Sequence, residues 1–139
     1  MKAAIIVFPG SNCDRDIAVS LEKVTNIKTT MVWHKEKSLP DCNLVIVPGG
    51  FTFGDYLRCG SIAANSPIMK DIKKEANKGM PTLGVCNGFL ILAESGLLPG
   101  TLIKNNCLSF LCKTVSLKVN NCNTKFSNKY SENEIINIP

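Results

Sequence analysis

The chain has 139 residues, of which 45% are hydrophobic, and a formal net charge of +5 at pH 7. This length and composition fit one globular domain, spanning residues 1–139, and exclude a disordered chain. No apolar run approaches the ~20 residues that a membrane-spanning helix requires, and the N-terminal apolar stretch is too short for a secretory signal. We therefore expect no membrane partner.

The positive charge does not by itself indicate a nucleic-acid partner. Its densest part, residues 70–78, lies on a predicted helix whose other side is apolar at Ile68, Ile72 and Ala76. No aromatic residues lie between these lysines to stack on bases, so we expect no nucleic-acid binding. The seven cysteines form no Cys-x-x-Cys pair. This pattern predicts no disulfide framework and no metal site, and it favours the reducing cytoplasm.

Strands and helices are expected to alternate over the first two thirds of the chain. Strands are predicted over residues 2–8, 28–33, 43–47 and 82–85, and helices over residues 14–23, 61–78 and 89–94. The strands are short apolar runs, which are typical of a parallel sheet buried on both faces. We therefore predict an α/β fold with a doubly wound, mostly parallel sheet. The first helix is expected to turn Ile17, Leu21 and Val24 inward, with Ser11 or Asn12 as its cap.

The pattern changes after residue 100. Residues 111–119 alternate between apolar and polar side chains, as in an antiparallel strand, and a polar stretch with a hairpin turn follows. Residues 135–139 have the composition of a strand that is cut off in mid-course. We therefore expect the sheet to be incomplete at the C-terminus.

Two loops at the carboxyl ends of strands bear on function. The loop after the first strand lacks the Gly-Lys-Ser/Thr of a phosphate loop and also lacks Gly-x-Gly-x-x-Gly, so we exclude nucleotide binding there. The third strand runs into Gly49 and Gly50, whose N–H groups can point at a ligand, because ligands bind at this edge of α/β sheets. The next loop, residues 51–60, is unusually aromatic and is expected to pack over the site as a wall.

The most informative stretch is residues 81–96, in which Cys86 lies between Gly84 and Gly88. The pattern Gly-x-Cys-x-Gly between a strand and a helix is a nucleophile elbow with sulfur in place of the usual serine oxygen. Its turn is so tight that side chains at the two flanking positions would collide with backbone. The N-terminus of the following helix favours an anion such as the reactive thiolate. A core cysteine would need no glycine on either side, so we interpret Cys86 as a nucleophile.

Several motifs together resemble one family of enzymes. They are Pro9-Gly10-Ser11-Asn12-Cys13-Asp14, Pro48-Gly49-Gly50-Phe51, Gly54-Asp55-Tyr56-Leu57-Arg58-Cys59-Gly60 and Gly84-Val85-Cys86-Asn87-Gly88-Phe89. Along its whole length the chain resembles the glutaminase subunits of phosphoribosylformylglycinamidine synthase, which are class I glutamine amidotransferases. The elbow marks only the broad class, and the Gly-Asp-Tyr-Leu-Arg loop makes the match specific. The resemblance implies the three-layer, flavodoxin-like fold of that class.

The resemblance also implies a reaction. Cys86 would attack the side-chain amide of glutamine, release ammonia and leave a γ-glutamyl thioester that water hydrolyses. The backbone N–H groups of Gly50 and Asn87 would bind the oxyanion, while Gly49 and Arg58 would contact the substrate or a partner.

The ammonia would pass to a larger synthetase subunit, which works with a small accessory subunit. The synthetase subunit would make phosphoribosylformylglycinamidine from formylglycinamide ribonucleotide in purine biosynthesis. ATP and Mg²⁺ would be used there, and this chain would need no cofactor.

The chain departs from the family pattern at two points. Leu90 replaces the glutamine that usually lies four residues after the nucleophile. The second departure concerns the general base. In the family this base belongs to a His-x-Glu or His-x-Asp pair that follows a strand like residues 136–139, where the present sequence stops. His34 is no substitute because it precedes the elbow.

A cysteine without a base loses a factor of roughly 10²–10⁴ in rate, so these 139 residues alone are expected to be a weak or inactive glutaminase. The alternatives are a non-catalytic module that only binds the synthetase subunit, and a different elbow-cysteine protein such as a peptidase. The Gly-Asp-Tyr-Leu-Arg loop disfavours the second alternative.

Overall fold

The computed structural model describes residues 2–56 and 58–139. Its contacts divide the chain into two compact units, Met1–Leu102 and Ile103–Pro139. The proposal of one domain over residues 1–139 stays a prediction. Leu57, in the Gly-Asp-Tyr-Leu-Arg motif, lies outside the described residues.

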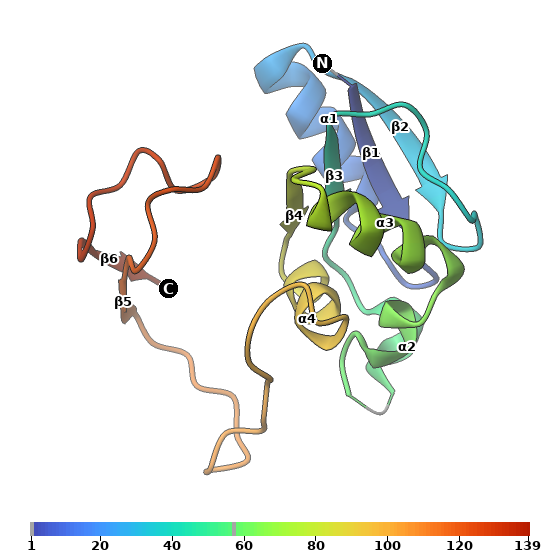
Figure 1. Cartoon of the computed structure of the whole chain (residues 1–139). Helices are drawn as coiled ribbons and strands as arrows, with labels where there is room; N and C mark the ends of the chain where they lie inside the picture. Colours follow the sequence, from blue (N-terminus) through green and yellow to red (C-terminus); the bar gives the residue numbers. More distant parts are fainter. Residues whose placement is uncertain (1, 57) are drawn as a thin grey trace. The chain divides into compact units, whose positions relative to one another are not determined.

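Among the described residues of the first unit, four strands form a parallel sheet in the order β2-β1-β3-β4 (Figure 1). They are β1 (Lys2–Val7), β2 (Lys28–Trp33), β3 (Leu44–Val47) and β4 (Thr82–Gly84). Residues 3–6 of β1 are fully buried, as expected for a strand in the middle of a sheet that is covered on both faces. The predicted α/β fold with a parallel sheet is confirmed.

Helices lie on both faces of this sheet (Figure 1). They are α1 (Asp14–Thr25), α2 (Ser61–Ala64), α3 (Pro67–Asn77) and α4 (Asn87–Glu94), and a short 3₁₀ helix, η1 (Thr52–Asp55), follows β3. The helices α2, α3 and α4 bury apolar side chains in one core with alternate residues of β1 and β3. The helix α1 packs on the opposite face, beside Ile46. This three-layer arrangement brings α4 and the β3–η1 loop to the carboxyl edge of the sheet.

The helix α1 is less buried than its apolar periodicity predicts. Ile17, Leu21 and Val24 line an open groove together with Ile46, and Val24 is 83% exposed. The prediction that Val24 faces inward is therefore wrong, because the last turn of α1 lies beside this open groove. The cap position is occupied by Cys13, whose side chain makes no capping hydrogen bond, so the prediction of Ser11 or Asn12 as the cap is wrong.

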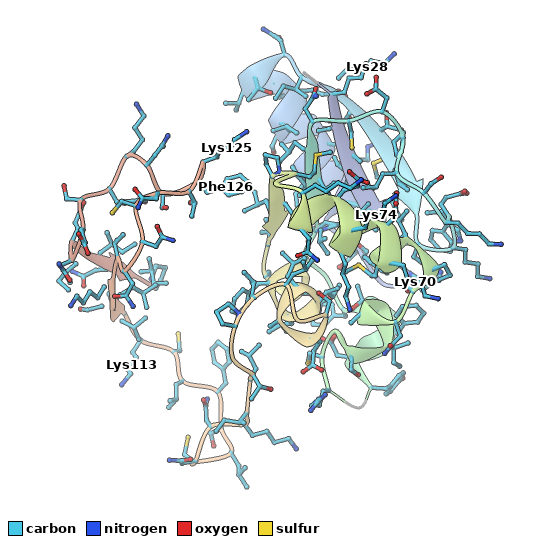
Figure 2. The ribbon with its side chains drawn as sticks, in the orientation of Figure 1. Lys28, Lys70, Lys74, Lys113, Lys125 and Phe126 are labelled. Carbon is cyan, nitrogen blue, oxygen red and sulfur yellow. The ribbon has the colours of Figure 1, made fainter. Side chains whose placement is uncertain are left out.

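The predicted helix over residues 61–78 is divided into α2 and α3. The break lies at Ser66, which is extended, and at Pro67, which begins α3. Proline lacks an N–H group and clashes with the preceding turn, so it starts helices and does not continue them. Ile68 and Ile72 are buried, as predicted, while Lys70 and Lys74, both labelled in Figure 2, are exposed and Lys73 is half-buried.

The second unit contains an antiparallel pair of strands, β5 (Val115–Lys118) and β6 (Ile135–Ile138). Val115 pairs with Ile138 and Leu117 with Ile136. The alternating pattern and the apolar end of the sequence therefore predicted both strands correctly.

Within the described part of the chain, no helix is long and apolar enough to cross a membrane.

Candidate active site

Cys86 lies at the junction of β4 and α4, with its side chain exposed. Its backbone has φ 52° and ψ −112°, in the left-handed half of the map that residues other than glycine rarely adopt. Strain of this kind is kept only where the surrounding structure imposes it, and it is common at functional sites. The turn thus presents the sulfur at the N-terminus of α4, as expected for a nucleophile elbow.

The two glycines that flank Cys86 are required by close contacts between backbone segments. A Cβ atom added to Gly88 would lie 1.9 Å from the carbonyl oxygen of Val47, and one added to Gly84 would lie 2.6 Å from the carbonyl oxygen of Gly88. Both distances are far below van der Waals contact. The crowding predicted from the Gly-x-Cys-x-Gly pattern is therefore confirmed.

The Gly49-Gly50 bend lies beside Cys86. A Cβ atom added to Gly49 would be 3.3 Å from the Cβ of Cys86. Gly50 has φ 134°. Neither the N–H of Gly50 nor that of Asn87 donates a hydrogen bond to another described residue, so both are available to a ligand. Their binding of an oxyanion stays a prediction.

The loop after β1 braces this bend. The N–H of Phe51 donates to the carbonyl of Gly10 at 2.9 Å, and the N–H of Phe53 donates to the carbonyl of Pro9 at 2.7 Å. Cys13 also approaches, because its sulfur would lie 3.7 Å from a Cβ atom added to Gly49. The Pro9–Asp14 motif therefore supports the candidate site through its backbone.

The side chain of Asn87 joins the elbow to the loop after β3. Its Oδ1 accepts hydrogen bonds from the N–H and the Oγ1 of Thr52, at 3.2 and 2.7 Å. Its Nδ2 donates to Oδ1 of Asp55 at 2.9 Å. Sequence reasoning singled out Asn87 only for its backbone and did not single out Thr52. The available signal was a polar amide at the start of a helix that is otherwise apolar from Phe89 to Ala93.

The aromatic side chains of the loop 51–60 do not form the predicted wall over the site. Phe51 and Tyr56 are exposed, and Phe53 alone turns inward, where its ring lies 5.4 Å from that of His34. The physical reason is that Phe53, Gly54 and Asp55 all have positive φ, which reverses the chain within one short turn.

Arg58 forms an ion pair with Glu94, with 2.7 Å between its guanidinium nitrogen and the carboxylate oxygen. Glu94 is the last residue of α4. The arginine therefore already has a partner within the chain. Its predicted contact with glutamine or a partner subunit stays a prediction.

His34 is buried directly after β2. Its Nδ1 lies 3.2 Å from the Oγ of Ser66, and the rings of Phe8, Trp33 and Phe53 surround it. Burial, and secondarily the positive charge of Lys35, lower the pKa of His34 below its ordinary value. These contacts favour a structural role for this imidazole, in line with the expectation that it is not the base for Cys86.

Comparison with known proteins matches the whole chain, residues 1–139, to the model of the CobB/CobQ-like glutamine amidotransferase domain. The chain is 54% identical to phosphoribosylformylglycinamidine synthase subunit PurQ of Zymomonas mobilis and 48% identical to that of Bartonella henselae. These alignments cover the entire chain, and the chain spans 63% and 62% of the length of the two relatives.

A solved structure of PurLQS from Thermotoga maritima is also similar, with a TM-score of 0.83 and 44% identity. The similarity covers 99% of this chain and 64% of the matched one.

Proposed function

Because the chain belongs to the family of CobB/CobQ-like glutamine amidotransferase domains, we propose that Cys86 is the nucleophile of a glutaminase. The observation that carries this proposal is the exposed thiol at a strained strand-to-helix turn, next to the Gly49-Gly50 bend. The sulfur attacks the amide carbon of the glutamine side chain and the C–N bond breaks. The proton lost by the thiol is made up on the departing nitrogen, so ammonia leaves as the γ-glutamyl thioester forms. Water then hydrolyses the thioester to glutamate.

The negative charge that develops on the amide oxygen needs hydrogen-bond donors. The N–H groups of Gly50 and Asn87 donate to no described residue, and they belong to the Gly49-Gly50 bend and to the residue after Cys86, so they suit this role. Such donors are fixed in place before the reaction, and removal of one from comparable sites lowers the rate about 10²–10³-fold. Gly49 matters for a different reason, since a Cβ atom at this position would lie only 3.3 Å from the Cβ of Cys86, so a side chain there would require the bend or the cysteine to shift.

The names of the relatives suggest where the ammonia goes. We propose that it passes to a synthetase subunit of phosphoribosylformylglycinamidine synthase, with a small accessory subunit in the same complex. The synthetase would use ATP and Mg²⁺ to convert formylglycinamide ribonucleotide to its amidine, and this chain would need no cofactor. All seven cysteines are unpaired, which fits a reducing compartment, and we propose the cytoplasm.

The two chemical steps differ in what they require. Hydrolysis of the thioester depends on a general base more strongly than the attack by a thiolate does. His34 is the only histidine of the 139 residues and is bound to Ser66. These residues alone should therefore form the thioester faster than they hydrolyse it.

The test measures both steps on the full chain. After incubation with glutamine, ammonia release is measured, and peptide-level mass spectrometry looks for a γ-glutamyl adduct on Cys86. In parallel, the chain is treated with a glutamine analogue that carries an electrophilic ketone. We expect an adduct at Cys86 that glutamine prevents and that is absent from Cys86→Ser.

Cys59 provides the control, because it is also exposed but lies outside the elbow. If the analogue modifies Cys59 and Cys86 at equal rates, or if glutamine gives no protection, the proposed glutaminase function is wrong.

A further inference from the structure

We infer that the side-chain amide of Asn87 is a positioning group, which fixes the loop that follows Gly50 relative to Cys86. This inference rests on the proposed glutaminase function and extends it. The family resemblance concerns the backbone N–H of Asn87, whereas the contacts with Thr52 and Asp55 are made by its side chain.

The amide of Asn87 reaches the loop at two places. Its oxygen accepts from both the N–H and the hydroxyl of Thr52, and its nitrogen donates to the carboxylate of Asp55. Asn87 and Thr52 are 2% and 3% exposed. Hydrogen bonds between buried groups are costly to break, because the groups left behind find no water. The contact between elbow and loop is therefore specific and difficult to replace.

The two places are the residue before a strained turn and the last residue of that turn. Phe53, Gly54 and Asp55 have φ values of 53°, 72° and 53°. Residues other than glycine adopt such angles only where the surrounding structure imposes them. By binding Thr52 before the turn and Asp55 at its end, Asn87 holds the strained segment closed.

The same contact connects the two parts of the proposed oxyanion site. Thr52 follows Gly50 by two residues, and Asn87 follows Cys86 directly. A change in the loop therefore moves the N–H of Gly50 relative to the thiol. In enzymes, a misplacement of about 1 Å can lower a rate by ~10²-fold.

The experiment compares two electrophiles at Cys86, using the full chain. The glutamine analogue needs a formed pocket and an oxyanion site, whereas iodoacetamide needs only an accessible thiol. Rates are measured on the Cys86 peptide by mass spectrometry, since other cysteines of the chain are exposed as well. The variants are Asn87→Leu, which removes all three bonds, and the milder Thr52→Val, which removes only the hydroxyl donor.

Two further variants make the test specific. Asp55→Ala removes the acceptor for Asn87, whereas Asp55→Asn keeps an oxygen there and should restore the behaviour of the unmodified chain. Asn65→Leu is the matched control, because Asn65 is an exposed amide directly after α2, and among the described residues its side chain bonds only the carbonyl of Ser61.

We expect Asn87→Leu to lower the maximal rate of reaction with the analogue by roughly tenfold or more, with its half-saturating concentration little changed. The iodoacetamide rate should change less than about twofold, because the elbow itself is held by Gly84 and Gly88. Thr52→Val and Asp55→Ala should show smaller losses of the same kind. Equal losses with both electrophiles, or a loss in Asn65→Leu as large as in Asn87→Leu, would overturn the inference.

Hydrogen exchange separates this inference from the proposed function. In Asn87→Leu and Thr52→Val, the amides of residues 51–55 should exchange faster than in the unmodified chain and in Asn65→Leu. If the analogue fails to label even the unmodified chain, the glutaminase proposal is wrong, and exchange alone decides whether Asn87 positions the loop. Unchanged exchange in both variants contradicts the inference whatever the labelling shows.

Discussion

The guanidinium of Arg58 donates a 2.7 Å hydrogen bond to the carboxylate of Glu94, which ties the loop after β3 to the last residue of α4. The side chain of Arg58 is 70% exposed, whereas that of Glu94 is 9% exposed. A nearly buried carboxylate is costly without a partner. Arg58 therefore contributes to the fold in addition to any contact with glutamine or a partner subunit.

We expect Arg58→Ala and Glu94→Gln each to lower the free energy of unfolding by about 1 kcal/mol. The double variant should lose little more than either single variant, because both remove the same pair. Urea titration of the four proteins measures this coupling. If Arg58→Ala leaves stability unchanged yet slows labelling of Cys86 by the glutamine analogue, the arginine serves the substrate instead.

Gly88→Ala should be strongly destabilising, because its methyl group would lie 1.9 Å from the carbonyl oxygen of Val47. Neither backbone can yield without opening the contact between β3 and α4. We expect a loss of ~3 kcal/mol or more in the free energy of unfolding, measured by urea denaturation.

Gly96→Ala is the control for this prediction. Gly96 has φ 77°, and an added methyl group would meet nothing within 4 Å. Only the backbone conformation is then penalised, at about 1 kcal/mol. Equal losses in the two variants would show that crowding at Gly88 is not the cause.

The core and surface isoleucines of α2 and α3 should respond differently to truncation. Ile72 is fully buried, whereas Ile62 is exposed. Ile72→Ala should cost roughly 2–5 kcal/mol because it leaves a cavity, and Ile62→Ala should cost less than about 1 kcal/mol. Thermal and urea unfolding of both variants check this packing, and a small loss for Ile72→Ala would contradict it.

His34 should make stability depend on pH. Its pKa in the folded chain lies below the ordinary value of 6.5, so the unfolded chain binds the proton more readily. The stabilisation is fully present above about pH 6.5 and is lost as the pH falls from there towards the lower pKa of the folded state. This pH range can be covered by urea titrations between pH 8 and pH 5. The urea midpoint should decrease on acidification.

His34→Gln is the matched variant, since it keeps a group that can bond Ser66 but cannot titrate. Its urea midpoint should change less over the same range. The carboxylates Glu22, Asp41 and Glu75 have pKa values lowered from 4.5, 3.8 and 4.5, so they titrate below this window. Parallel pH profiles of the two proteins would exclude His34 as the cause.

Much of the sheet could be predicted from local patterns. The strand over residues 28–33 was predicted with its observed bounds, and the elbow was recognised because crowding requires glycine on both sides of Cys86. The start of α3 was also signalled, since Ser66-Pro67 is a common way to begin a helix. The prediction of one continuous helix overlooked that signal.

Other features depend on contacts between distant residues. Periodicity showed that Val24 shares a face with Ile17, but it carries no information on how far the neighbouring strands extend beneath that face. The role of the Asn87 side chain depends on Thr52, which is 35 residues earlier in the chain. No local pattern predicts which loop such an amide will meet.

The contact between Gly88 and Val47 is made by main-chain atoms alone, and this has an evolutionary consequence. Core side chains can be exchanged for others of similar volume, and compensating replacements nearby can recover the lost stability. No such repair exists at position 88, because every amino acid has the same carbonyl group. The core side chains of this domain can therefore diverge in sequence, while the distance between the end of β3 and the start of α4, which positions the sulfur of Cys86, stays constant.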